Sequence, residues 1–322
     1  MIEAQGLCMR YGPVTALEDC SFDVRKGEIV GLLGPNGAGK STAMKILTTF
    51  LYPTSGTATV AGHDVLTEPL EVRRRMGALP ENLPLYSRLE VGEYLKFVAQ
   101  ARGVTGKTLA SRMAWVLERT GLGVMYYRPI GELSKGYRQR TALAQALIHD
   151  PDVIILDEPT TGLDPHQILD IRKLVKELAA DRTVLFSTHI LQEVEAIADR
   201  IVIISQGRIV AAGSLAELTG QAGLQPGVEI VIRAEFDSAR ESLEHCVPGC
   251  SVDLARVEGE WSCIRLQGEE PALVCSAVYR EAVSQGWDLR SIRPEPVSLE
   301  SVFLALTRAE KPAAAEGGKA HA

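Results

Sequence analysis

The chain carries, at positions 34–42, the run Gly34-Pro35-Asn36-Gly37-Ala38-Gly39-Lys40-Ser41-Thr42. This phosphate loop matches the spacing G-x-x-x-x-G-K-[ST], and it stands between an expected short strand over 27–34 and an expected helix over 41–49. Glycines let backbone N–H groups turn toward phosphate oxygens, and a helix N-terminus adds partial positive charge. The run therefore predicts an α/β nucleotide-binding domain. In it Lys40 would reach the β- and γ-phosphates, and the Ser41 hydroxyl would bind Mg²⁺.

Composition and charge narrow the class of protein. The 322 residues allow one large or two medium domains, and 46% hydrophobic with 23% charged residues is typical of a folded soluble protein. A net charge of −7 gives no support for a nucleic-acid-binding protein.

No run of about 18 apolar residues is present, so we expect no membrane span. The N-terminus lacks the basic-then-apolar pattern of a signal peptide. Six scattered cysteines without metal-type spacing are expected to be reduced thiols.

Residues 1–215 alternate strand and helix patterns, which predicts a layered α/β domain. The expected elements after residue 150 are strands at 152–156, 183–187 and 201–205, and helices at 167–180 and 191–199. Between about residues 84 and 140 the pattern becomes helical. Its three expected helices are 91–102, 107–120 and 135–149. This stretch predicts a helical subdomain inserted into the α/β core.

The rest of the chain predicts a second, smaller module. Residues 216–227 contain three glycines and one proline and are expected to form a linker. Residues 228–307 follow the order β-α-β-β-α-β, which indicates an α+β accessory module of ferredoxin-like type. Residues 308–322 are rich in Ala, Gly and Lys and are expected to be a disordered tail.

A second chemical motif is an apolar strand that ends in two acids, Asp157 and Glu158. A buried strand of an α/β sheet delivers the side chains at its carboxyl end into the ligand crevice. There Asp157 suits the Mg²⁺ shell, and Glu158 could take a proton from an attacking water. By itself such an end is more often a solvated strand end. The phosphate loop and the next motif favour the catalytic interpretation.

The third motif, Leu133-Ser134-Lys135-Gly136-Tyr137-Arg138-Gln139-Arg140, follows the phosphate loop by about ninety residues and is called the signature run here. A Leu-Ser-x-Gly sequence at the head of a helix resembles the signature of the ATP-binding cassette (ABC) ATPases. The resemblance covers residues 1–215. The motifs follow one another in the order typical of the family. They are Tyr11, the phosphate loop, the residues around 81, the signature run, Asp157-Glu158, residues 161–164 and His189. It implies a P-loop NTPase (RecA-like) core, an ABC antiparallel β-sheet and the inserted helical subdomain.

The resemblance also assigns roles to individual residues. Tyr11 would stack on adenine, and His189 would contact the γ-phosphate. Ser134 and Gly136 would contact the γ-phosphate bound to the opposite subunit, and Asp164 would lie in the loop that links the two sites. Considered alone, a tyrosine such as Tyr11 is more often an ordinary surface or core residue, and a lone histidine such as His189 is more often structural.

Three positions depart from the family pattern. Glu81 stands where Gln is common. It could still bind Mg²⁺ or orient water, but it adds negative charge near the phosphates. Lys135 replaces a usual Gly and Tyr137 a usual Gln. The helix N-terminus is retained, so we expect binding across the dimer to be retained.

The departures resemble one branch of the family, the ATPases of gliding-motility-type and copper-enzyme-maturation-type exporters. These work with separately encoded permeases. The branch often has a C-terminal Ser-Leu-Glu-x-x-Phe-like segment, matched here by residues 298–303. An ordinary amphipathic helix capped by Ser298 explains the same six residues equally well.

The sequence thus predicts the ATP-hydrolysing subunit of a transporter, most simply an exporter. Two copies would bind two Mg·ATP head to tail and drive a multi-span permease. The protein would be cytoplasmic and held peripherally on the cytoplasmic face of the inner membrane. The loop after Glu81 and the inserted helices would contact the permease.

Two alternatives remain from the sequence. One is an ABC protein that acts on ribosomes or DNA. Against it, the chain has a single cassette, and the ninety residues before the signature run leave no room for long coiled coils. The run Arg73-Arg74-Arg75 fits a solvated helix face better than a nucleic-acid contact. The other alternative concerns the C-terminal module alone, which would serve regulation or dimerisation.

Overall fold

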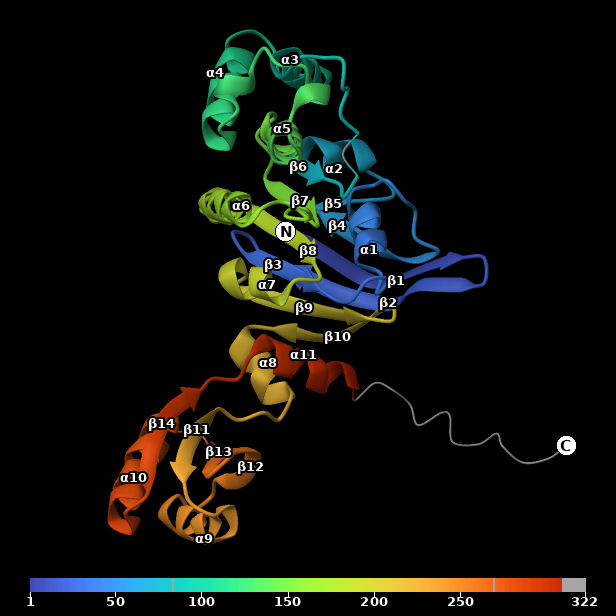
Figure 1. Cartoon of the computed structure of the whole chain (residues 1–322). Coiled ribbons are helices and arrows are strands. Elements are labelled where there is room, and N and C mark those ends of the chain that lie inside the picture. The colour runs from blue at the N-terminus through green and yellow to red at the C-terminus, as the bar shows by residue number, and fades with distance from the viewer. Residues whose placement is uncertain (83, 269, 309–322) are drawn as a thin grey trace, which may run out of the picture. The chain divides into compact units, whose positions relative to one another are not determined.

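The computed structural model describes residues 1–82, 84–268 and 270–308 of the chain. The chain divides into two compact units, with the boundary between Leu215 and Ala216 (Figure 1). Of the tail expected over 308–322, only Arg308 is described, and it ends a helix. The remaining tail residues lie outside the described part of the chain.

The first unit is built on a six-stranded sheet (Figure 1). In order across the sheet, its strands are β10 (Arg208–Gly213), β9 (Arg200–Ser205), β3 (Ile29–Leu33), β8 (Thr183–Thr188), β7 (Val153–Asp157) and β6 (Met76–Leu79). All neighbours are parallel except β10 and β9. Every residue of β3, β7 and β8 is buried. Burial on both faces explains why these segments are continuous apolar runs without alternation.

A second, antiparallel sheet packs over the phosphate-loop helix. Its strands in order are β2 (Val14–Val24), β1 (Ile2–Tyr11), β4 (Ser55–Val60) and β5 (His63–Asp64). Helix α1 (Lys40–Leu47) contributes Ile46 and Leu47 to one core cluster that also contains Leu7 of β1 and Leu32 of β3. Helix α1 is therefore held between the two sheets, which fixes the direction in which its N-terminus points.

The inserted part of the first unit contains the helices α3 (Val91–Ala101) and α4 (Gly106–Thr120). Helix α5 (Lys135–Leu147) also lies partly in this segment, but it packs against β6 of the central sheet. The expected end of the insert at residue 140 therefore falls inside a helix that belongs to both parts. Glu90 and Glu93 form a capping box at the start of α3, which fixes where that helix begins.

Two further helices follow strand ends near the site. They are α6 (Pro165–Ala179) and α7 (Leu191–Ile197). Helix α2 (Pro69–Arg75) carries the three arginines at positions 73–75, which are exposed as expected of a solvated helix face. Arg74 pairs with Glu71 and Arg75 with Asp152.

The second unit has its own core and its own sheet. The elements are β11 (Gly227–Arg233), α9 (Phe236–Cys246), β12 (Ser251–Glu258), β13 (Trp261–Gln267), α10 (Pro271–Gln285), β14 (Asp288–Glu295) and α11 (Leu299–Arg308). The strand order β12-β13-β11-β14 is antiparallel throughout. Val228, Ile230 and Ile232 of β11 point to one face and join the core with residues of α9 and α10. This is the β-α-β-β-α-β arrangement of a ferredoxin-like fold.

Part of the expected linker over 216–227 is helical. Helix α8 covers Leu215–Gln221, and Leu218 is fully buried. Of the three glycines that suggested a flexible segment, Gly220 lies in α8, Gly223 follows it with a φ of 64°, and Gly227 begins β11. The expected linker is therefore helical up to Gln221, and residues 222–226 connect α8 to β11.

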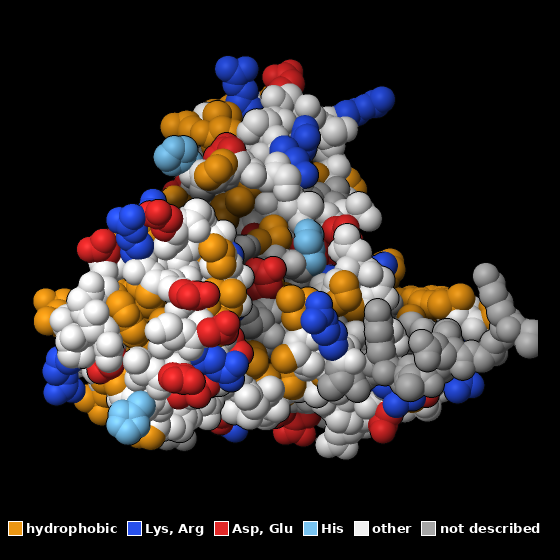
Figure 2. Space-filling view, turned by 60° about the horizontal axis from the view of Figure 1, so that its bottom comes forward, with side chains coloured by type: hydrophobic (Ala, Val, Ile, Leu, Met, Phe, Trp, Pro, Cys, Tyr) orange, Lys and Arg blue, Asp and Glu red, His pale blue; other side chains and the backbone are white. Residues whose placement is uncertain are grey.

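Charged side chains of both signs are interspersed on the face seen in Figure 2. None of the helices in the described part of the chain has both the length and the apolar character needed to cross a bilayer.

Candidate functional site

The central sheet brings three functional segments to one edge. Strands β3, β8 and β7 are parallel neighbours, with Leu33 opposite Thr188 and Ser187 opposite Asp157. The phosphate loop follows β3, His189 follows β8, and Glu158 follows β7. Because the carboxyl ends of parallel strands open into the same crevice, segments more than one hundred residues apart meet there.

Close backbone packing explains two of the three glycines of the phosphate loop, Gly34 and Gly39. A Cβ atom added at Gly34 would lie 2.3 Å from the carbonyl oxygen of Ile204. At Gly39, which caps α1 with a φ of 107°, a Cβ atom would lie 2.6 Å from the carbonyl oxygen of Ala16. A side chain at either position would push the loop away from the sheet, so its curvature depends on glycine.

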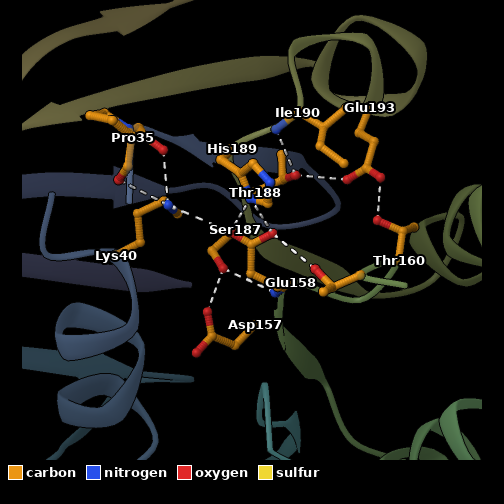
Figure 3. Close-up of polar contacts among 12 residues, drawn as sticks. Pro35, Lys40, Asp157, Glu158, Thr160, Ser187, Thr188, His189, Ile190 and Glu193 are labelled. Carbon is orange, nitrogen blue, oxygen red and sulfur yellow. Dashed lines mark hydrogen bonds and ion pairs between the residues drawn. The ribbon is translucent and has the colours of Figure 1, made fainter. Parts of the chain in front are cut away.

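Lys40 lies inside this loop and is only 5% exposed. Its ammonium donates hydrogen bonds to the carbonyl oxygens of Gly34 at 2.8 Å and Pro35 at 3.2 Å. It also lies 3.5 Å from Oε1 of Glu158 (Figure 3). The buried cation is thus held by the loop it belongs to and balances a buried carboxylate.

A cavity of about 300 Å³ opens beside the loop. Its lining residues are Ala16, Asn36, Gly37, Gly39, Lys40, Ser41, Thr42, Glu81 and Glu158. Glu81 follows strand β6, so the structure brings its exposed side chain to the same cavity. Lys40 is the single basic residue among these lining residues, while Glu81 and Glu158 are acidic.

Asp157, at the end of β7, holds two hydroxyl groups. Its Oδ1 accepts hydrogen bonds from Ser41 Oγ at 3.2 Å and from Ser187 Oγ at 2.5 Å. Asp157 is only 5% exposed, so these two hydroxyl groups take the place of water around its carboxylate. Ser41 and Asp157 therefore present oxygen ligands side by side next to the phosphate loop.

Glu158 is 8% exposed and has an uncommon backbone conformation. Its φ of 49° lies in the left-handed region, which costs a residue with a side chain on the order of 1 kcal/mol. The backbone N–H donates to the carbonyl and hydroxyl oxygens of Ser187. Nδ1 of His189 lies 3.0 and 2.9 Å from the two carboxylate oxygens, and the Thr161 hydroxyl donates to Oε2 (Figure 3). The side chain is therefore fixed between Lys40 and His189.

A group of buried polar residues behind the site was not foreseen from the sequence. Glu193 accepts hydrogen bonds from the hydroxyls of Thr160 and Thr188. Ser187 links Asp157 to Glu158, as described above. Their sequence signal was weak but present, because Ser187 and Thr188 precede His189 at a strand end and Glu193 follows it by four residues.

The signature run begins α5 and contacts residues 159–167. Ser134 is the N-cap, with its hydroxyl accepting from the N–H of Tyr137. A Cβ atom at Gly162 would lie 1.9 Å from Nζ of Lys135, so this lysine extends over the backbone of Gly162. Deeper in α5, the buried Gln139 donates to the carbonyl oxygen of Pro159 at 2.8 Å. The signature helix is thus connected to the residues that follow Glu158.

The predicted residues fall into two groups. The phosphate loop, Asp157, Glu158, His189 and Glu81 meet at one edge of the sheet, as described above. Asp157 and His189 join the cavity through their contacts with Ser41 and Glu158, whereas four others lie outside its lining, namely Tyr11, Ser134, Gly136 and Asp164. Tyr11 ends β1 and is 46% exposed, and Asp164 is the N-cap of α6.

Comparison with known proteins gives the family. A model of the ABC transporter family matches residues 17–161. The linearmycin resistance ATP-binding protein LnrL of Bacillus subtilis is 33% identical over 311 residues, covering 95% of this chain and 98% of LnrL. The daunorubicin/doxorubicin resistance ATP-binding protein DrrA of Streptomyces peucetius is 33% identical over 308 residues, covering 95% of this chain and 92% of DrrA.

A similar solved structure contains the products of ATP hydrolysis. The dimeric structure of a post-hydrolysis state of the ATP-binding cassette MJ0796, bound to ADP and Pi, superimposes with a TM-score of 0.61 at 25% identity. The superposition covers 67% of this chain and 99% of the MJ0796 chain. The nucleotide cavity, the two acids at the end of β7 and these similarities agree, and the chain belongs to the ABC transporter ATP-binding family as an ATP-binding subunit with ATPase activity.

Proposed function

We propose that two copies of this chain bind two Mg·ATP head to tail and drive a separately encoded multi-span permease that exports its substrate. The observation that carries the proposal is the position of Glu158. It is buried beside the phosphate loop, 3.5 Å from Lys40 and within hydrogen-bond distance of His189. A carboxylate so placed suits a general base for the water that attacks the γ-phosphate.

The other residues of the site have supporting roles. The backbone of 34–42 and the ammonium of Lys40 would bind the β- and γ-phosphates. His189 is 42% exposed at its side chain, whereas Glu158 is 8% exposed. The imidazole therefore extends from the buried carboxylate toward the solvent side, where it could contact the γ-phosphate. Glu81, at the cavity wall, would orient water or a metal-bound ligand.

The donor set fits Mg²⁺. Ser41 and Asp157 supply oxygen ligands 3.2 Å apart. Across the residues that the structure describes, no three His, Cys, Asp or Glu side chains are grouped as a metal site. This suits Mg²⁺, which is commonly held by one or two carboxylates together with substrate phosphates. Bound there, the ion would neutralise charge on the phosphates, and Ser41, Asp157 and Glu81 are the residues that would hold it.

Pairing of two chains would complete the site. Ser134 and Gly136 begin α5, with the Ser134 side chain exposed, and they are absent from the cavity of their own chain. A helix N-terminus is a natural phosphate-binding element. We propose that it contacts the ATP of a second copy, with Asp164 in the loop between the two sites and Tyr11 against the adenine. The dimeric form of the MJ0796 cassette supports this arrangement.

The permease contact is proposed at the inserted segment. Tyr86 is 55% exposed and Phe97 50% exposed, and their ring centroids lie 5.9 Å apart. Tyr86 lies in the loop after Glu81 and Phe97 in α3, so this exposed aromatic pair joins the loop after the cavity to the inserted helices. Large exposed aromatic side chains next to each other are typical of a protein contact.

Export is supported by the names of the relatives, which speak of resistance to linearmycin and to daunorubicin and doxorubicin. These two names do not mention gliding motility or copper-enzyme maturation, so that narrower branch remains a prediction. Through its permease the chain would lie on the cytoplasmic face of the inner membrane.

Purification from membranes tests the proposal. The tagged full-length chain should copurify with a multi-span protein after mild detergent extraction. The double variant Tyr86→Ser and Phe97→Ser should reduce that recovery about tenfold or more and leave ATP binding unchanged. Recovery of ribosomes or DNA instead, lost at raised salt, would favour the nucleic-acid alternative. The acidic net charge and the interspersed surface charges of Figure 2 do not favour it.

A further inference from the structure

A buried carboxylate lies behind the catalytic residues and belongs to none of the roles above. Glu193, in the first turn of α7, is 2% exposed. One of its oxygens accepts a hydrogen bond from the Thr160 hydroxyl, and the other accepts from the Thr188 hydroxyl at 2.8 Å (Figure 3). Thr160 and Thr188 are 4% and 0% exposed. Burying a carboxyl group costs free energy unless hydrogen bonds compensate it, and here the two threonine hydroxyls supply them.

The two hydroxyl partners are next to the two catalytic residues. Thr160 follows Glu158 by two residues, and Thr188 immediately precedes His189. The Thr188 hydroxyl also accepts the backbone N–H of Ile190 at 3.0 Å, so its proton is directed toward Glu193. One carboxylate thus joins the segment that carries Glu158 to the segment that carries His189.

The backbone conformation of Glu158 explains why a connection between these two segments is needed. A φ of 49° is unfavourable for a residue with a side chain and persists only where surrounding contacts hold it. On one side the N–H of Glu158 is held by Ser187. On the other side the chain leaves through Pro159 to Thr160, which is bonded to Glu193. The contact between His189 and Glu158 therefore depends on two neighbouring segments being kept together.

We propose that Glu193 is a positioning residue for ATP hydrolysis, which holds His189 against Glu158 through its hydrogen bonds to Thr160 and Thr188. This inference rests on the proposed roles of Glu158 and His189. Its hydrogen bonds, rather than its charge, perform the function. A glutamine at this position could keep both contacts, because its amide oxygen accepts from one threonine while its NH₂ group donates to the hydroxyl oxygen of the other.

Steady-state ATPase kinetics of the purified full-length chain test the proposal. Glu193→Ala should lower kcat about tenfold or more and leave KM for ATP within about twofold, because the lost geometry affects the chemical step. Glu193→Gln should keep kcat within about threefold of the parent. Glu195→Ala, an exposed glutamate on the same helix, is the matched control and should change neither constant. Thr160→Val breaks one of the two bonds and serves as the second variant if Glu193→Ala does not fold.

The decisive readout is the combination with His189→Ala. If Glu193 acts by positioning His189, adding Glu193→Ala to that variant lowers kcat no further. Equal losses in the two backgrounds would overturn the proposal, because Glu193 would then act independently of His189. A loss in Glu193→Gln as large as in Glu193→Ala would also overturn it, in favour of a role for the charge. An unchanged kcat in His189→Ala alone would contradict the proposed role of His189, and the inference would fail with it.

Discussion

His189 Nδ1 lies 2.9 Å from Oε2 and 3.0 Å from Oε1 of Glu158, so the imidazole faces both oxygens of the carboxylate. Lys40 approaches the same carboxylate at 3.5 Å. The side chain at the end of β7 is thus held by one group from the end of β8 and one from the loop after β3. This relation joins the three strand ends into a single site.

Replacing Lys40 should weaken nucleotide binding strongly, whereas removing another lysine of the same helix should not. We expect Lys40→Met to weaken ATP binding about a hundredfold, because the buried ammonium is the one cation lining the cavity and Glu158 would lose its partner. A fluorescent ATP analogue titrated into the full-length chain measures this. The control is Lys45→Met, on the exposed side of the same helix, which should bind normally. Normal affinity in Lys40→Met would contradict the assignment of the phosphate site.

Acid should destabilise the first unit through His149. Burial lowers the pKa of this imidazole to about 4 from an ordinary 6.5, and the positive charges of Arg102 and Arg112 act in the same direction. Its Nε2 lies 3.0 Å from the carbonyl oxygen of Met76, while its buried Nδ1 has no hydrogen-bond partner among the described residues. The folded state therefore favours the neutral ring. Between about pH 6.5 and 4 the unfolded chain binds the extra proton, so stability is present above 6.5 and falls as the pH falls.

Urea unfolding at pH 7 and pH 5 checks this prediction. His149→Gln should show a smaller loss of stability between the two pH values than the parent chain. His166→Gln removes an exposed histidine and should leave the pH dependence unchanged. If His149→Gln and the parent lose equal stability on acidification, His149 is not the group responsible.

A chain that ends at Leu215 should bind ATP as the full-length chain does. All the residues that line the nucleotide cavity belong to the first unit, and the second unit has a separate core. Isothermal titration should give affinities within about threefold for the two forms. A folded 1–215 fragment that has lost ATP binding would contradict this independence.

The same fragment tests the role of the C-terminal module, because an unchanged oligomeric state, ATPase rate and transport would argue against regulation or dimerisation.

A negative charge at the signature helix should prevent pairing and spare ATP binding. Ser134 caps α5, and Asp is an equally good N-cap, so Ser134→Asp retains about the same helix stability. In the Glu158→Gln background it should block ATP-dependent dimerisation, because the new carboxylate would face the γ-phosphate of the second copy. Ser134→Asn keeps a good cap without the charge and should pair more readily than Ser134→Asp. Light scattering compares the two, and equal dimerisation would show that α5 does not approach a phosphate.

Much of the fold could be predicted because strong local patterns coincide with burial. Strands β3, β7 and β8 are apolar runs between turn residues, and the helices around them carry clear apolar faces, so their ends were placed within about two residues. The phosphate loop, Asp157 and Glu158 could be located for the same reason. The loop follows β3, Asp157 ends β7 and Glu158 comes directly after it, and both strands are buried on both faces.

Other features depended on tertiary contacts that no local pattern reports. Glu193 resembles an ordinary acidic residue in the first turn of a surface helix, yet it is buried because Thr160 and Thr188 reach it from two other segments. The contact of Lys135 with Gly162 likewise joins residues on different elements. The glycines at 220 and 223 predict a flexible segment, yet α8 extends through Gly220, because glycine is common at helix ends as well as in flexible segments.

Light scattering of the Glu158→Gln variant, with and without Mg·ATP, measures directly whether two ATP-bound chains pair. The amide retains the size of the side chain and removes the charge of the general base, so ATP should bind and remain unhydrolysed. We expect a monomer without nucleotide that becomes a dimer when Mg·ATP is added. A variant that binds ATP yet stays monomeric at every protein concentration measured would contradict the head-to-tail ATP-bound dimer.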